Sequence, residues 1–188
     1  MAFLSRRFAW RRRMYLLLAL LVFSSILIAD QLSKTMVLDA KLMGRIPMVI
    51  NEWFNLLLVW NRGVSFGMLA QDAAWGPWAL KGLAAILMLV MLRWLWNANH
   101  WAQAVALGAI LGGAVGNVID RFRYGAVVDF LDFHYGDWHY PAFNIADAGI
   151  CIGVVILVLE SIVTPLRRPK VVPQDTSYIS LKSHSSQE

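Results

Sequence analysis

Four apolar stretches, each about the length of a membrane-spanning helix, most constrain what this chain can fold into. They run over roughly 15–37, 77–96, 102–122 and 143–163. About 20 apolar residues cross a bilayer as an α-helix, which satisfies its backbone hydrogen bonds internally. Hydrophobic residues make up 59% of the chain, against roughly 45–50% in soluble domains. The pattern predicts an all-α membrane protein with four transmembrane helices.

Basic residues at the two ends of the chain predict its orientation. Arginines cluster before the first apolar run, and Arg167, Arg168 and Lys170 follow the last one. Positive residues beside membrane helices stay in the cytoplasm, and four crossings return the chain to one side, so both termini are expected to be cytoplasmic. We expect a basic arm at 1–14, a membrane domain at 15–165 and a basic, disordered tail at 166–188. Charge confined to the ends argues against nucleic-acid binding.

The segment 39–71 between the first two spans is expected on the outer side. Its stretch from Trp53 to Trp60 is too apolar for a free loop. We therefore predict short strands and an interfacial piece that lie on the membrane surface.

Two aspartates, Asp129 and Asp147, flank what reads as one short loop between the third and fourth spans. Antiparallel helices would place both carboxyls at nearly the same depth, near the outer face. Ionisable residues at such depth are costly and mark functional sites, and two adjacent carboxyls share a proton, as in aspartic proteases. The alternative is a structural pair tied to Arg121 or Arg123, and spacing alone does not separate the two interpretations. Asp132 and Asp137 are poorer candidates because wetter surroundings are expected for them.

Polar residues on the first and third spans predict a supporting shell. Asn117, Asp120 and Arg121 form an expected hydrogen-bonded cluster at a helix end. Asp30 and Lys34 are i,i+4 neighbours that should pair, either to neutralise each other or to line a substrate site. The third span also carries small residues at four-residue steps, which let another helix approach closely; they are Ala104, Gly108, Gly112 and Gly116.

Other chemistries have weaker support. Ser65 with Lys34 or Lys81 as its base would suggest a serine hydrolase, but no nucleophile motif brackets either lysine, and most serines in loops are solvated. The single Cys151 stands among apolar residues and is expected to be buried. The four histidines show no metal-ligand spacing, so we expect no metal and no cofactor.

Five motifs in order resemble bacterial lipoprotein signal peptidase, also called signal peptidase II. They are DQLSK (30–34), NRGVSF (61–66), GGAVGNVIDR (112–121), VVDF (127–130) and FNIAD (143–147). The resemblance covers about 15–163, and Val64 stands where the family usually has Ala.

The resemblance implies a membrane aspartic endopeptidase with Asp129 and Asp147 as its catalytic pair. The residues that would bind substrate or support the site are Asn61, Gly63, Asn117, Asp120, Arg121, Asn144, Asp30 and Lys34. The substrate would be a prolipoprotein, cut just before a cysteine that carries diacylglycerol. A small β-rich periplasmic cradle would lie between helices 1 and 2. We expect a monomer in the bacterial inner membrane, in contact with membrane lipids, with its active site near the periplasmic face.

Two other classes stay open on the residues alone. An aspartyl peptidase that cuts unlipidated helices would share the acid pair. A proton-coupled transporter or a membrane assembly factor would also keep paired acids in a bundle. A transporter would more often show internal repeats and helices broken at the midplane, and neither pattern is evident.

Overall fold

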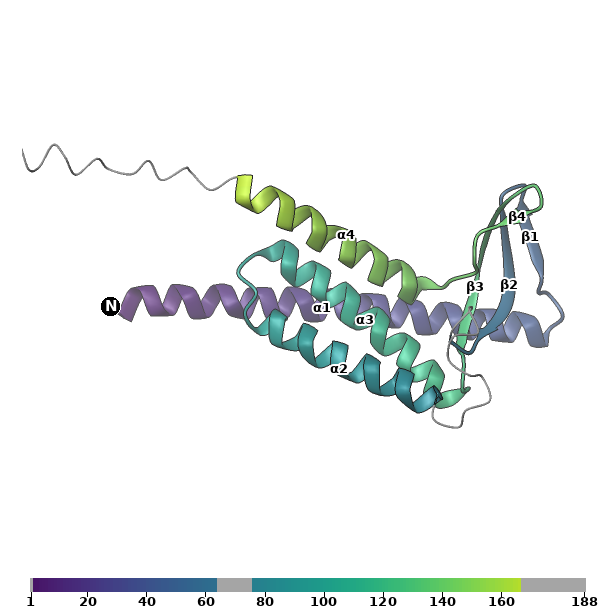
Figure 1. Ribbon diagram of the computed structural model, residues 1–188, viewed down its shortest axis with the longest axis horizontal. Coiled ribbons are helices and arrows are strands. Elements are labelled where there is room, and N and C mark those ends of the chain that lie inside the picture. The colour runs from purple at the N-terminus through teal and green to yellow at the C-terminus, as the bar shows by residue number, and fades with distance from the viewer. Residues whose placement is uncertain (1, 64–75, 167–188) are drawn as a thin grey trace, which may run out of the picture.

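The computed structural model describes residues 2–63 and 76–166 as four helices and a four-stranded antiparallel sheet. The helices lie side by side, and the sheet covers one end of them, at the right of Figure 1. The elements in chain order are α1 (Ala2–Leu42), β1 (Met48–Asn51), β2 (Phe54–Asn61), α2 (Gly76–Trp96), α3 (Trp101–Arg123), β3 (Val127–Tyr135), β4 (Trp138–His139) and α4 (Ile145–Leu166).

Helix α1 is longer at both ends than the predicted span. Neither Pro nor Gly occurs before Gly44, so nothing interrupts the backbone hydrogen bonds from the expected arm into the span. Gly44 ends the helix with φ of 69°. Its N–H donates to the Lys41 carbonyl at 3.0 Å, and the Arg45 N–H donates to the Ala40 carbonyl at 2.9 Å. This pair of bonds is the Schellman arrangement that glycine permits after a helix.

Three helices are long and apolar enough to cross a membrane, judged by length and composition within the described residues. They contain the spans Trp10–Leu42, Trp101–Arg123 and Ile145–Val163. The crossing by α2 stays a prediction. Cys151 is exposed on α4, so its expected burial was wrong. In a water-soluble protein, apolar neighbours predict that a residue is buried in the core. In a bilayer, a helix can instead turn such residues outward toward lipid.

Helix α3 lies between α1 and α4, and glycines allow the close contacts. A Cβ on Gly108 would lie 2.5 Å from the Ala19 carbonyl oxygen, and one on Gly112 would lie 2.6 Å from that of Phe23. A Cβ on Gly113 would collide with the Ala146 carbonyl oxygen on α4. The predicted role of the small-residue ridge is therefore confirmed: it brings helix backbones together.

Gly112→Ala is expected to destabilise the protein by about 1–3 kcal/mol, because the added methyl forces α1 and α3 apart. Thermal unfolding in detergent measures this change. Gly82→Ala is the matched control, since a Cβ there meets nothing within 4 Å and alanine favours a helix. Equal unfolding temperatures for the two variants would contradict the packing argument.

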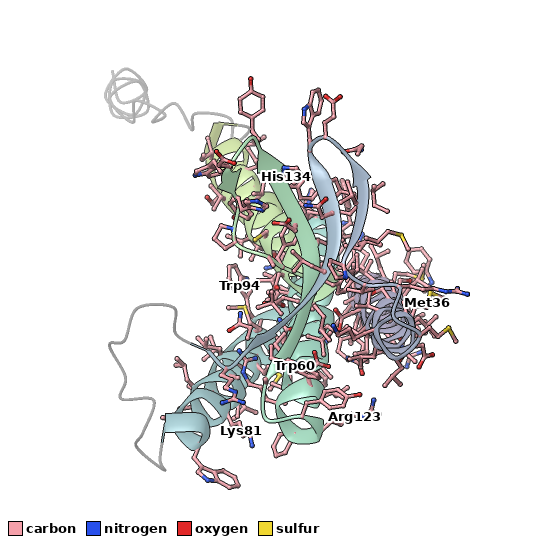
Figure 2. All side chains as sticks on the ribbon, turned by 90° about the vertical axis from the view of Figure 1, so that its right-hand side faces the viewer. Met36, Trp60, Lys81, Trp94, Arg123 and His134 are labelled. Carbon is pink, nitrogen blue, oxygen red and sulfur yellow. The ribbon has the colours of Figure 1, made fainter. Side chains whose placement is uncertain are left out.

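The sheet has the strand order β1-β2-β3-β4. The predicted strands between the first two helices are present as β1 and β2. The predicted short loop between α3 and α4 was wrong, because this segment holds β3 and β4 and supplies the other half of the sheet. The sequence of β3, VVDFLDFHY, is rich in β-branched and aromatic residues. This composition favours a strand and could have predicted it. Figure 2, turned to face the sheet, shows the strands in front of the helix ends.

Candidate active site

Asp129 lies on β3 and is almost fully buried, at 1% exposure. Its position on the sheet comes from the pairing of β2 with β3, in which Asn61 lies opposite Val127, two residues away. Side chains at this diagonal spacing are within reach of each other. Asn61 Nδ2 donates to one Asp129 oxygen at 2.9 Å, and Asn144 Nδ2 donates to the other at 2.7 Å. Both carboxyl oxygens are thus held by amide donors.

Asn61 is itself oriented by a turn. Its side-chain oxygen accepts from the Gly63 N–H at 2.9 Å, and Gly63 has φ of 82°, a conformation that glycine adopts at little cost. This bond leaves the amide nitrogen of Asn61 to face Asp129. Gly63 therefore supports the site through Asn61.

Asp147 lies in the first turn of α4 and takes part in a reciprocal helix cap. The Asp147 N–H donates to the Asn144 side-chain oxygen at 2.9 Å, and the Asn144 N–H donates to Asp147 Oδ2 at 3.2 Å. The second Asp147 oxygen accepts from Asn117 Nδ2 on α3 at 2.8 Å. A carboxylate at a helix N-terminus is also favoured by the helix dipole. The cap fixes Asp147 beside the residue that contacts Asp129.

Asn144 therefore connects the two acids. Its side chain is fully buried and donates to Asp129, while its backbone N–H donates to Asp147. Its Nδ2 also lies 3.1 Å from Asn117 Oδ1. The structure thus brings the two predicted acids together through one shared neighbour.

A buried ion cluster lies behind this pair. Lys34 Nζ is 2.8 Å from Asp30 Oδ2 and 2.7 Å from Asp120 Oδ2, and it donates to Asn117 Oδ1 at 3.1 Å. All four side chains are buried. The predicted pairing of Asp30 with Lys34 is confirmed. Lys34 is held by two acids and an amide, and this is not the arrangement expected of a lysine that acts as a base for Ser65. Ser65 and Val64 lie outside the described residues.

Each acid of the cluster also positions backbone near the site. Asp30 Oδ1 accepts from the Ala146 N–H at the start of α4, at 2.9 Å. Asp120 Oδ2 accepts from the Val128 N–H, at 3.2 Å, one residue before Asp129. Gln31, which the sequence did not indicate, donates to Asp120 Oδ1 at 3.1 Å and lies 3.2 Å from Asp30 Oδ2. Its position in the DQLSK motif, between Asp30 and Lys34, could have indicated this role.

Arg121 lies beside the site without contacting either acid by a hydrogen bond in the described structure. Its Nη1 donates to the Asn117 carbonyl at 3.2 Å, while its buried Nε has no partner among the described residues. Arg121 and Asn117 line one end of a cavity of about 320 Å³ whose other walls are apolar, with Leu87, Met88 and Met91 of α2 among them. Arg123 donates to Gln31 instead. The alternative of an acid pair tied to arginine gains no support.

Asp132 is not in wet surroundings, and that expectation was wrong. It is 3% exposed and accepts hydrogen bonds from Asn55 at 3.0 Å and His139 at 2.8 Å. Burial acts to raise the pKa of Asp132, but these bonds outweigh it and lower the pKa below its usual value. The reason is the sheet: the pairing of β2 with β3 places Asn55 opposite Asp132, and β4, which pairs with β3, supplies His139. Within the described residues, no three His, Cys, Asp or Glu side chains gather as a metal site.

The environment of Asp129 favours its protonated form. Its pKa is raised from 3.8 to about 6: burial is the largest cause and the nearby Asp147 carboxyl adds to it, while hydrogen bonds from Asn61 and Asn144 oppose the rise. A raised pKa on a buried acid with a second acid nearby is the pattern expected of acid–base chemistry.

Infrared titration should show the protonated carboxyl band of Asp129 disappearing with a midpoint near pH 6, identified by its absence in Asp129→Asn. Because folding raises this pKa, the group stabilises the fold fully below pH 4, and this contribution is lost as the pH rises through 6. A midpoint near 4 would contradict the raised pKa.

Comparison with known proteins gives consistent matches. The family model described as signal peptidase (SPase) II matches residues 22–163. A lipoprotein signal peptidase of Burkholderia cenocepacia is 45% identical over 73% of this chain and 82% of its own length. One from Polynucleobacter necessarius is 44% identical over 77% and 86%. A solved bacterial membrane enzyme superposes with a TM-score of 0.67 at 26% identity, over 82% of this chain and 93% of that chain.

Proposed function

Because the chain belongs to the signal peptidase II family of proteases, we propose that Asp129 and Asp147 are its catalytic pair. The substrate is a prolipoprotein that carries diacylglycerol on a cysteine, and the bond before that cysteine is cut. One observation carries the assignment of the pair: Asn144 donates to both carboxyls at once. Two carboxyls held side by side share one proton.

In the mechanism, the singly protonated pair acts on one water. The shared proton is assigned to Asp129, whose pKa is raised to about 6, mainly by burial, and Asp147 acts as the base. Asp147 takes a proton from the water as its oxygen attacks the scissile carbonyl, while Asp129 donates a hydrogen bond to the carbonyl oxygen. Asp147 then gives its proton to the departing amine, and the carboxylic product is released.

Asn61 and Asn144 keep the acids in place as charge moves between them, since each donates to Asp129. Asn117 does the same for Asp147. Arg121 has an unused buried donor and lines the apolar cavity, where it would meet a polar group of the bound substrate. The apolar walls suit an acyl chain or the apolar part of a signal peptide, and binding there would orient the scissile bond.

The topology that fits this function has four crossings with both termini in the cytoplasm. Helix α2 is the fourth crossing, with Trp94 and Trp96 near its end as interfacial residues. The acids and the sheet then lie at the periplasmic face of the inner membrane, where β1 to β4 form the substrate cradle. The protein works as a monomer among membrane lipids and needs no metal or other cofactor.

The discriminating experiment compares precursors with and without diacylglycerol, incubated with purified protein in detergent. Cleavage of the lipidated precursor at a rate at least about 100-fold higher is expected, because remote acyl contacts contribute to transition-state binding. Equal cleavage of both precursors would favour a peptidase for unlipidated helices. Cleavage of neither would favour a transporter or an assembly factor.

A further inference from the structure

A cavity with a basic lining lies at the end of the helices opposite the sheet. Its volume is about 340 Å³, and its walls come from the first part of α1 and from the connection between α2 and α3. They are formed by Arg11, Arg12, Tyr15, Trp96, Asn97, Ala98 and Asn99. None of these described lining residues is acidic, so the cavity carries net positive charge. The acid pair is on β3 and in the first turn of α4, which Figure 1 shows at the other end of the molecule, and it does not use this cavity.

Arg12 is fixed in a way that suits an anion. Its guanidinium carbon lies 3.8 Å from the centroid of the Trp96 ring, a stacking contact that orients the guanidinium plane. Its Nε is buried and has no hydrogen-bond partner among the described residues. A buried donor without an acceptor costs free energy, and a phosphate oxygen is among the acceptors that guanidinium groups bind strongly.

An apolar groove begins beside this cavity. Its volume is about 410 Å³, and it runs between α1, α2 and α3. Leu16 and Leu95 line the groove, while their neighbours Tyr15 and Trp96 line the basic cavity. The groove continues along Leu16, Leu20 and Phe23 of α1, Met88 and Leu92 of α2, and Leu111 and Val115 of α3. The two spaces together have the chemistry of an amphiphile: an anionic head followed by a hydrocarbon chain.

We infer that this end of the molecule binds a phospholipid with an anionic headgroup. The phosphate contacts Arg11 and Arg12, with Asn97 and Asn99 as further polar partners, and one acyl chain fills the groove. Basic pockets between membrane helices are suited to such headgroups. That the lipid belongs to the cytoplasmic leaflet depends on the proposed topology; the binding itself does not. The bound lipid would hold α1 and α2 together at the end far from the active site.

Native mass spectrometry of the full-length protein, delipidated in detergent, tests this inference with dioleoylphosphatidylglycerol, dioleoylphosphatidylcholine and inorganic phosphate as separate probes. The wild type should retain one phosphatidylglycerol with about tenfold or greater preference over phosphatidylcholine. The double variant Arg11→Gln/Arg12→Gln should bind it about 10-fold to 30-fold more weakly, since each arginine near an anionic headgroup contributes about fivefold. Arg93→Gln is the matched control, because Arg93 is exposed near the same end, in the last turn of α2, and lines neither space.

Equal retention of the two lipids, or equal weakening by Arg93→Gln, would overturn the inference. If inorganic phosphate bound as tightly as phosphatidylglycerol, the acyl chain would contribute nothing to binding. The site would then be an anion site, and the inference of a lipid would be overturned. If the double variant does not fold, the preference of the wild type between the two lipids decides alone. None of these readouts requires cleavage, so failure of the proposed peptidase activity would leave this test intact.

Discussion

Asp129→Asn and Asp147→Asn should each lower kcat for cleavage of a lipidated precursor by about 10³-fold or more. Each substitution removes a carboxyl that must take or hold a proton in the transition state, and single losses of such groups cost on this scale. The amide has nearly the same size, so thermal unfolding should change little. The measurement is a time course of precursor cleavage in detergent, normalised to folded protein.

Asp132→Asn is the matched control for these variants. Asp132 lies on the same strand as Asp129, is similarly buried and also accepts hydrogen bonds from two side chains. In the described structure it makes no hydrogen bond with Asn144 or Asp147. Its activity should stay within about tenfold of the wild type. If Asp132→Asn lost as much activity as Asp129→Asn, the loss would come from disturbing a buried acid on β3. That result would contradict the assignment of the pair.

Lys34→Met should destabilise the protein by about 3–5 kcal/mol, the cost of removing one partner from a buried ion pair. Lys34 is the cation between Asp30 and Asp120, and without it two buried carboxylates face each other. The distortion should also spread to the site, because Asp30 holds the start of α4 and Asp120 holds β3. Chemical or thermal unfolding in detergent measures the loss.

Lys41→Met provides the comparison for Lys34→Met. Lys41 is an exposed lysine in the last turn of the same helix, and its removal should cost no more than about 1 kcal/mol through the helix dipole. Similar unfolding of the two variants would contradict a buried cluster that stabilises the fold.

The helices could be predicted from the sequence because a long apolar run in a membrane must satisfy its own backbone hydrogen bonds, which an α-helix does. Predicted and observed bounds agree closely for the second and third helices. The ends of α1 could not be set from the apolar run, since a helix continues through polar residues until a residue such as Gly44 ends it. The strand β3 was missed because nearby polar residues suggested a loop, although its residue types favour a strand.

The acid pair was predicted from two aspartates at one depth, and the structure brings them together through Asn144. What the sequence could not show is how each carboxyl is held. The hydrogen bonds from Asn61 and Asn144 to Asp129, from Asn117 to Asp147 and from the start of α4 to Asp30 join positions far apart in the chain. Asp132 was misjudged for the same reason, because its burial comes from pairing of the strands.

We propose that this acid pair cuts a lipidated precursor at one bond. The most direct measurement is mass spectrometry of both products after incubation of a diacylglyceryl precursor with purified wild-type protein and, in parallel, with Asp147→Asn. The wild type should release a mature product beginning at the lipidated cysteine, and Asp147→Asn should leave the precursor intact. A wild-type cut at another bond, or full processing by Asp147→Asn, would contradict the proposal.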